Sequence, residues 1–297
     1  MSQNRMLLKR DIKEKKELVN IEMDRFLPRK DEYPKQIHKA IRHSLFAGGK
    51  RLRPYLLSHT YLLFADNVKL ILPIAGALEM LHTYTLIHDD LPEIDNDDYR
   101  RGKKSCHIVY GSDIALLAGD TLLVSAFEAI NSSDVDAKLK LQLIKEFGHE
   151  TGHRGLIAGQ MVDILSEGKS VNEKTLKFIH KNKTARLINL PIRFGCLLAH
   201  ANEKDMQIMR VYGEKIGLAF QIMDDILDVE GSLEELGKTT GKDSLAKKMT
   251  YPALYGLEKS HLMAEKLIAD ARLQLEKFGE KGIYLDLLAN FILTRKY

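Results

Sequence analysis

The residues most able to do chemistry are two clusters of carboxylates. The first is the stretch DDLPEIDNDD at 89–98, which is followed, after Tyr99, by two arginines. Like charges packed this closely repel one another and need cations to hold them. Pro92 is expected to stop a helix near residue 90, which lets Asp95 return from a loop toward Asp89. Such oxygen ligands suit Mg²⁺ together with substrate phosphate, although a solvated acidic loop is the alternative.

The second cluster, QIMDDILD at 221–228, places acids within an apolar stretch. Asp224 and Asp228 are four residues apart and share a helix face, and Gln221 lies one turn before Asp224. A buried carboxylate without a partner is costly, and a metal ion is a partner that two of them can share. The segment therefore indicates a second metal-binding face, against the alternative of surface acids on a helix.

Three basic segments could bind the oxygens of a phosphate. Residues 48–54 read GGKRLRP, a turn that opens a helix and so offers free backbone N–H groups to an anion. Residues 237–243 read GKTTGKD, and Lys183 is followed by a hydroxyl at Thr184. Any one of these segments is more often surface decoration. Together with two carboxylate clusters, they describe a site for a polyphosphate substrate bound with metal ions.

These residues must be positioned by helices, because the dominant hydrophobic period along the chain is helical. Residues 5–27, for example, place apolar side chains every three to four positions, with charges between them. Similar patterns extend over 35–46, 54–65, 71–90, 113–131, 135–163, 173–181, 184–200, 203–229, 251–277 and 282–294. Strand-type alternation is nearly absent, and no low-complexity linker divides the blocks. The pattern predicts a single all-α domain over 1–297.

The composition excludes several classes of protein. With 44% hydrophobic and 29% charged residues, the chain is typical of a globular protein, and its net charge of +4 is too small to indicate a nucleic-acid partner. Membrane insertion is not expected, because the most apolar candidate, 111–130, contains three acids. Residues 1–27 are too charged for a signal-peptide core, and two cysteines cannot form a disulfide framework. We therefore expect a cytoplasmic protein.

The motifs, taken in order, resemble those of the trans-isoprenyl diphosphate synthases, and most closely the short-chain bacterial farnesyl diphosphate synthases. The resemblance extends from about residue 38 to the C-terminus. It rests on GGKRLRP (48–54), EMLHTYTLIHDDLPEIDNDDYRRG (79–102), LAGDTLL (117–123), GQMVDI (159–164), HKNKTARLI (180–188), LAFQIMDDILDVEG (218–231) and GKTTGKDSLAKKMTYPALYGLE (237–258). Several motifs in the expected order make this match far more specific than a single DDxxxxD would.

The resemblance implies an isoprenoid synthase-type bundle of antiparallel helices around a deep central cavity, and a homodimer. The two Asp-rich segments would face each other across the cavity mouth and hold about three Mg²⁺ ions in the closed complex. The implied metal ligands are Asp89, Asp95 and Asp224, with Asp90 and Asp228 as auxiliary ligands. The residues implied for the allylic diphosphate are Arg100, Lys183, Thr184, Gln221, Lys238 and Lys248. Those implied for isopentenyl diphosphate are Lys50, Arg53, His82 and Arg101.

The implied reaction is the Mg²⁺-dependent condensation of isopentenyl diphosphate with dimethylallyl or geranyl diphosphate. Loss of pyrophosphate from the allylic substrate leaves a carbocation, which Thr184 and Gln221 can stabilise as neutral oxygen dipoles. Lys183 and Arg100 would help to neutralise the leaving group. No side-chain nucleophile is needed, because the acids and lysines act through electrostatics and positioning.

Product length is expected to depend on the helix face below the first acidic segment. Tyr84 and Thr85 lie five and four residues before Asp89, and Thr85 shares its helix face. In the family, a bulky aromatic residue at the fifth position tends to stop the product at fifteen carbons. We therefore expect farnesyl diphosphate, with geranylgeranyl diphosphate as the alternative.

Residues 149–153, HETGH, indicate a different chemistry, since they fit the H-E-x-x-H pattern of zinc hydrolases. On a helix, His149 and His153 would share a face, with Glu150 as the general base. Gly152 weakens a helix at this point, and the glycine of the extended pattern is absent, so this is the remote alternative. A non-catalytic helical interaction protein is a third class, which would require both acidic clusters to be decorative.

Overall fold

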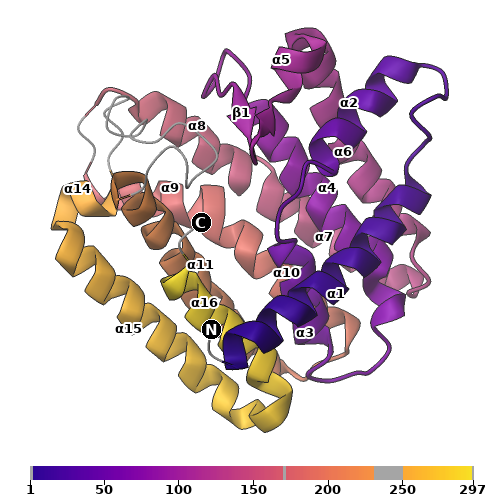
Figure 1. Ribbon diagram of the computed structural model, residues 1–297. Coiled ribbons are helices and arrows are strands. Elements are labelled where there is room, and N and C mark those ends of the chain that lie inside the picture. The colour runs from indigo at the N-terminus through magenta and orange to yellow at the C-terminus, as the bar shows by residue number, and fades with distance from the viewer. Residues whose placement is uncertain (1–2, 170–171, 231–249, 296–297) are drawn as a thin grey trace.

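The computed structural model describes residues 3–169, 172–230 and 250–295, and most of these residues are helical (Figure 1). The first elements are α1 (Gln3–Phe26), α2 (Lys35–Leu45), α3 (Leu52–Tyr61), η1 (Val68–Ile71), α4 (Leu72–Asp89), β1 (Tyr99–Arg100), β2 (Lys103–Lys104), α5 (Cys106–Tyr110), α6 (Ser112–Ser132) and α7 (Ala137–Thr151). The remaining elements are α8 (Leu156–Ser166), α9 (Glu173–Ile179), η2 (His180–Ala185), α10 (Arg186–Leu198), α11 (Glu203–Glu230), α14 (Tyr251–Tyr255), α15 (Leu257–Leu275), η3 (Glu276–Gly282) and α16 (Ile283–Thr294). Within the described residues, the only strands are β1 and β2, which form one short antiparallel hairpin. The all-α prediction is confirmed.

Two predicted helices are broken at glycines. The block 135–163 forms α7 and α8, because α7 ends at Thr151 and Gly155 lies close to the preceding turn. A Cβ at Gly155 would lie 1.9 Å from the carbonyl oxygen of Glu150, so only glycine fits there. The block 251–277 forms α14 and α15, which are separated by Gly256 at φ +82°. The helical period was correct in both blocks, but the prediction that each was one helix was wrong.

The core helix of the fold is α4, which packs most extensively on α6. By length and composition, Val68–Asp89 could cross a membrane, with a mean hydropathy of 1.5 in its most apolar window, but 61% of that window is buried inside the protein. This segment, and not 111–130, is therefore the one described helix that is long and apolar enough to cross a membrane. Its apolar character is accounted for by burial in the core.

The buried side chains form two clusters that meet at α10. Leu187, Leu190 and Phe194 belong to the cluster built around α4 and α6. Ile188 and Ile192, on another face of the same helix, belong to the cluster built around α11, α15 and α16. Because α10 is apolar on both faces, it joins the two halves of the molecule.

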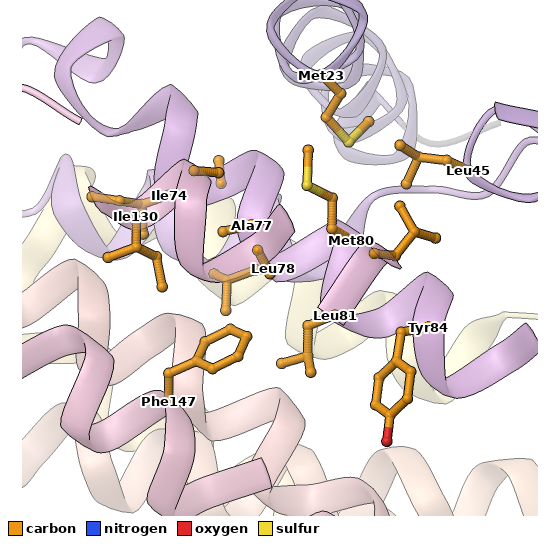
Figure 2. Packing of buried hydrophobic residues seen from close by; sticks show 14 of the residues in the cluster. Met23, Leu45, Ile74, Ala77, Leu78, Met80, Leu81, Tyr84, Ile130 and Phe147 are labelled. Atoms are coloured by element: carbon orange, nitrogen blue, oxygen red, sulfur yellow. The ribbon is translucent and has the colours of Figure 1, made fainter. Parts of the chain in front are cut away.

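Figure 2 shows the first cluster at close range. Met23 of α1 approaches Met80 of α4, and Phe147 of α7 lies beneath Leu78. Phe147 is fully buried and meets the Phe127 ring edge-on at a centroid distance of 4.7 Å. Truncating such a ring to alanine typically costs about 3–5 kcal/mol of stability. The helices that carry the candidate site residues are therefore held by dense packing.

Candidate active site

One cavity of about 520 Å³ brings together most of the residues singled out from the sequence. Its lining includes Lys50, Arg53, His82, Thr85, Asp89, Asp95, Arg100, Arg101, Lys183, Thr184, Gln221 and Asp224. These residues come from the start of α3, from α4 and the loop that follows it, and from η2 and α11. Segments far apart in the sequence therefore converge on one polar space within a helical bundle.

The first acidic segment folds back on itself at the end of α4. The backbone N–H of Asp95 donates to the carbonyl oxygen of Asp89 at 2.8 Å, as expected for a loop that returns after Pro92. Burial raises the pKa of Asp89, Lys183 opposes this shift, and Asp95 adds to it. Two carboxylates brought together in a buried place are better satisfied by a cation than by each other.

Asp90 points elsewhere and does not join this pair. It is buried, and its Oδ1 accepts a hydrogen bond from Nε of Arg100 at 2.9 Å, while Asp97 accepts one from Nη2 of the same guanidinium at 2.7 Å. Burial, only partly offset by Arg100, raises the pKa of Asp90 to about 6, so the carboxylate is ionised at pH 7. Arg100 therefore lines the cavity, and its guanidinium is held in place by hydrogen bonds to Asp90 and Asp97.

The second acidic segment lies on α11. Asp224 lines the cavity, and Asp225 borders it while being buried. Gln221, one turn earlier, accepts a hydrogen bond on Oε1 from the hydroxyl of Thr184 at 2.5 Å. Asp228 is not among the cavity-lining residues. Its role as an auxiliary metal ligand stays a prediction that rests on its helical alignment with Asp224.

Lys183 and Thr184 lie on η2, which is a π-helix between α9 and α10. The wider π-turn carries one more residue per hydrogen-bonded loop than an α-helix. Lys183 donates from Nζ to Oδ2 of Asp163 on α8 at 2.6 Å. A Cβ at Gly159 would lie 2.4 Å from the backbone nitrogen of Lys183, so the glycine permits α8 to approach η2 closely.

A second basic group lies at the start of α3 and on α4. It contains Arg51, Arg53 and His82 together with one acid, Glu79. Glu79 is buried, and its Oε1 accepts a hydrogen bond from Nη1 of Arg51 at 2.7 Å. Within the described residues, Nε of Arg53 and Nδ1 of His82 are buried without a hydrogen-bond partner. Burial lowers the pKa of Arg53 to about 10 and that of His82 well below its usual value, so Arg53 remains charged and His82 is neutral at pH 7. Buried donors left unpaired in this way indicate a place for an anion.

The C-terminal helix brings one further cation to the cavity. Arg295 lies with its guanidinium carbon 3.8 Å from the ring centroid of Phe220, and Nη2 donates to Oδ1 of Asp224 at 2.6 Å. Helix α16, which ends just before Arg295, packs against α11 (Figure 1). Lys50, also in the lining, lies over the Phe291 ring of α16 at 4.8 Å.

The two expected length-determining residues differ in position. Thr85 lines the cavity, whereas Tyr84 does not. Tyr84 is 9% exposed and meets the ring of His88 edge-on at 4.8 Å, and in Figure 2 it extends from α4 on the same side as Leu81. The role of Tyr84 in limiting product length therefore stays a prediction, and Thr85 is the one of the two that lines the cavity. Lys238 and Lys248 lie outside the described residues.

The H-E-x-x-H segment does not form a metal site. Helix α7 ends at Thr151, so His149 lies in its last turn while His153 lies beyond it and is exposed. Oε2 of Glu150 accepts a hydrogen bond from Nη1 of Arg186 at 2.6 Å. The two histidines therefore do not share a helix face. Glu150, which would be the general base of a zinc hydrolase, is instead paired with Arg186.

Four residues at this site could not be assigned a role from the motifs alone. Asp163, Gln160, Asp225 and Arg295 all line the cavity, but none was assigned a role. A signal existed for three of them, since the motif GQMVDI at 159–164 contains Gln160 and Asp163, and the acidic segment at 221–228 contains Asp225. Nothing in the local sequence around Arg295 indicates that it reaches α11.

Comparison with known proteins gives concordant results. The family model described as Polyprenyl synthetase matches residues 34–281. A geranylgeranyl diphosphate synthase of Cyanophora paradoxa is 46% identical over 285 residues, which cover 95% of this chain and 94% of the relative.

Two solved structures share the fold. A Helicobacter pylori geranyltransferase complexed with magnesium and isoprenyl diphosphate has a TM-score of 0.85 at 30% identity, covering 99% of this chain and 97% of that one. A Zymomonas mobilis FPP/GFPP synthase has a TM-score of 0.87 at 32% identity, covering 97% and 99%. The helical bundle seen here is therefore that of the isoprenyl diphosphate synthases.

Proposed function

The chain belongs to the polyprenyl synthetase family and is a prenyltransferase, and we propose that it condenses an allylic diphosphate with isopentenyl diphosphate to give mainly geranylgeranyl diphosphate. The observation that carries the proposal is the single cavity in which Asp89, Asp95 and Asp224 meet separate groups of cations. Such a cavity can hold two diphosphates without a nucleophilic side chain.

Magnesium fits the acidic side of this cavity. The donors are carboxylate oxygens, which Mg²⁺ prefers, and the raised pKa of Asp89 shows that its charge is under-compensated in the protein alone. Bound Mg²⁺ would neutralise charge on the diphosphate leaving group. We propose Asp89, Asp95 and Asp224 as its ligands, with about three ions per site in the substrate complex. The magnesium in the Helicobacter pylori structure supports this proposal.

The remaining side chains would bind and orient the allylic substrate. Lys183, held by Asp163, and Arg100, held by Asp90, present fixed cations to the diphosphate. When the C1–O bond breaks, both electrons leave with pyrophosphate, and C1 becomes part of an allylic cation. Thr184 would then stabilise the cation through the lone pairs of its hydroxyl oxygen.

The acceptor substrate would occupy the second basic group. Among the described residues, Arg53 and His82 have buried side-chain nitrogens without a hydrogen-bond partner, and Arg101 and Lys50 line the same cavity, so these four would bind the diphosphate of isopentenyl diphosphate. The double bond of isopentenyl diphosphate attacks C1, a new C–C bond forms, and a proton leaves from the neighbouring carbon. The released pyrophosphate would accept that proton.

Two observations favour the twenty-carbon product over the fifteen-carbon product expected from Tyr84. The Cyanophora paradoxa relative, which matches almost the whole chain, is named for geranylgeranyl diphosphate. Tyr84 also lies outside the cavity lining and packs on His88, so it is not placed to block a growing chain directly. Farnesyl diphosphate is the second candidate, because the aromatic side chain of Tyr84 lies only one residue from Thr85 in the wall.

Product analysis tests this proposal. Purified protein would be incubated with labelled isopentenyl diphosphate, geranyl diphosphate and Mg²⁺, with an EDTA control, and the products separated by chain length. A twenty-carbon diphosphate that disappears with EDTA supports the proposal. A fifteen-carbon end product would select the second candidate, and no condensation by folded protein would refute both.

We also propose a homodimer, which the resemblance implied. Leu117 and Val124 are seven residues apart on one face of α6, and they are 58% and 59% exposed. Burial against a second copy would remove these apolar side chains from water. Sedimentation at micromolar concentration would show a mass twice that of the chain, and Leu117→Glu would shift it to monomer.

A further inference from the structure

The two adjacent acids of α11 have different surroundings. Asp224 faces the cations of the cavity, whereas Asp225 is only 3% exposed. Oδ1 of Asp225 accepts a hydrogen bond from Nε2 of Gln221 at 2.8 Å. Oδ2 accepts one from the backbone N–H of Tyr251 at 3.0 Å. Both carboxylate oxygens are therefore engaged by hydrogen-bond donors of the protein itself.

These contacts determine which group donates in each hydrogen bond of the series that links Tyr251, Asp225, Gln221 and Thr184. A carboxylate can only accept, so the atom of Gln221 that faces Asp225 must be the amide nitrogen. The carbonyl oxygen Oε1 then faces Thr184, whose Oγ1 lies 2.5 Å away. Two oxygens at this distance share a proton, and only the Thr184 hydroxyl has one to give. This assignment follows from donor chemistry and not from the placement of hydrogens.

The consequence for the cavity is a hydroxyl with a defined polarity. Thr184 lines the cavity, and its proton is committed to Gln221. Toward the cavity, its oxygen can therefore act only as an acceptor, with its lone pairs available. A freely rotating hydroxyl would spend part of its time with the positive end of the dipole toward the cavity.

The position of Asp225 is itself held from the other side. The rings of His180 and Tyr251 stack at a centroid distance of 5.1 Å, and Nε2 of His180 lies 3.6 Å from Oδ2 of Asp225. Tyr251 is the first residue of α14, where backbone N–H groups have no partner within the helix. The carboxylate thus satisfies a helix end while it orients the amide.

We propose that Asp225 is a positioning residue for prenyl transfer: it orients the Gln221 amide, which turns the Thr184 proton away from the cavity and presents the hydroxyl oxygen to the allylic cation. The inference rests on the proposed function, since it requires a cation to form beside Thr184. Asp225 touches no substrate in this role and acts through two intermediate groups.

Asp225→Asn is the sharpest test, because it keeps the shape of the side chain but reverses which group donates in the hydrogen bonds to Gln221 and Thr184. The N–H of Tyr251 requires the carbonyl oxygen of the new amide, so its NH₂ must face Gln221. Gln221 then turns its own carbonyl toward residue 225 and its NH₂ toward Thr184, which forces the hydroxyl proton into the cavity. We expect kcat to fall about 10- to 100-fold with KM for both substrates within about twofold. Glu214→Gln, which removes an acid from the exposed face of α11, is the matched control and should leave kcat unchanged.

Two double variants separate proton order from the loss of a negative charge. In a Thr184→Val background there is no hydroxyl to reorient, so Asp225→Asn should change kcat by less than about twofold. An equal loss in both backgrounds would mean that the charge alone matters and would overturn the inference. Asp225→Asn with Gln221→Glu restores a carboxylate that accepts from both neighbours, so kcat should return to within about threefold of the wild type. This second variant also keeps the inference testable if Asp225→Asn alone folds poorly.

A binding measurement distinguishes failure of this inference from failure of the proposed function. The probe is a tertiary-ammonium analogue of dimethylallyl diphosphate, compared with its uncharged carbon isostere by calorimetry in Mg²⁺. The wild type should prefer the charged analogue about tenfold, and Asp225→Asn should lose most of that preference. A wild type that shows neither prenyl transfer nor preference refutes the proposed function. A wild type that shows both, with the preference intact in Asp225→Asn, refutes only the role of Asp225.

Discussion

Arg295 donates from Nη2 to Oδ1 of Asp224 at 2.6 Å, although 71 residues separate them in the sequence. The guanidinium is 9% exposed and also covers the ring of Phe220. The carboxylate proposed to bind magnesium is therefore paired with an internal cation. A metal ion that binds Asp224 competes with this partner for the charge of the carboxylate.

Arg295→Met should lower the magnesium concentration for half-maximal turnover about three- to tenfold, because an ion pair of about 1 kcal/mol no longer competes with the metal. Methionine keeps the apolar contact with Phe220. The KM for the diphosphate substrates should rise, since a cation leaves the cavity. A magnesium titration of initial rates measures both effects. Arg272→Met is the matched control, because Arg272 pairs with Asp286 on α16 and is absent from the cavity lining.

Asp89→Asn should lower turnover at saturating Mg²⁺ by at least about 10²-fold, since one metal ligand is lost. In EDTA, however, the same variant should be at least as resistant to urea as the wild type. The pKa of Asp89 is raised by burial, so its ionised form destabilises the metal-free protein at pH 7 and the amide relieves this cost. Asp98→Asn, in the exposed part of the same loop, should change neither property. Normal rates in Asp89→Asn would falsify the metal assignment.

Thr85→Phe should shorten the product by at least one isoprene unit, because it inserts a ring into the cavity wall. Tyr84→Phe removes only a hydroxyl outside the lining and should leave the product distribution unchanged. Tyr84→Ala, in contrast, opens space beside Leu81 and should lengthen the product if the growing chain reaches that level. Chromatography of the three product sets checks these outcomes. An unchanged distribution in Thr85→Phe would remove this face of α4 from length control.

Lowering the pH from 7 to 5 should destabilise the wild type more than His82→Gln. Burial, reinforced by nearby arginines, lowers the pKa of His82 well below 6.5. The unfolded chain therefore binds a proton that the folded protein excludes, and the free energy of unfolding falls as the pH drops below about 6.5. The difference between the two proteins should approach about 1.4 kcal/mol per pH unit. Urea unfolding in EDTA at several pH values measures it, with His153→Gln, at an exposed position, as the control.

Much of the fold could be predicted from hydrophobic period, because helices such as α4, α6 and α11 are long and each must bury an apolar face. The breaks could not be predicted with equal success, since period alone does not show that Gly155 touches the carbonyl of Glu150. The π-turn at 180–185 was missed for a related reason. Over six residues, a period of 3.6 cannot be distinguished from a slightly longer one.

The cavity was predicted well where motifs are dense and poorly where contacts are distant. The return of Asp95 toward Asp89 followed from Pro92, and the shared lining of Lys183 and Gln221 followed from the motifs. Arg295 was not found, because its partner lies on another helix and no local pattern encodes a tertiary contact. Thr85 lines the cavity and Tyr84 does not, because one residue along a helix is a rotation of about 100°; the length-limiting role of Tyr84 stays a prediction.

The π-turn of η2 has a simple arithmetic. The π-turn is equivalent to one extra residue inserted into what would otherwise be a regular helix from Glu173 to Leu198. Deleting one residue from 180–185 would restore that helix and rotate everything on one side of the deletion by about 100° relative to the other. Lys183 and Thr184 could then no longer lie in the cavity while the faces of α10 remain in the core. Deleting one residue would thus leave a well-packed helical protein without its active site. The rotational register of this helix and the presence of the site therefore depend on each other.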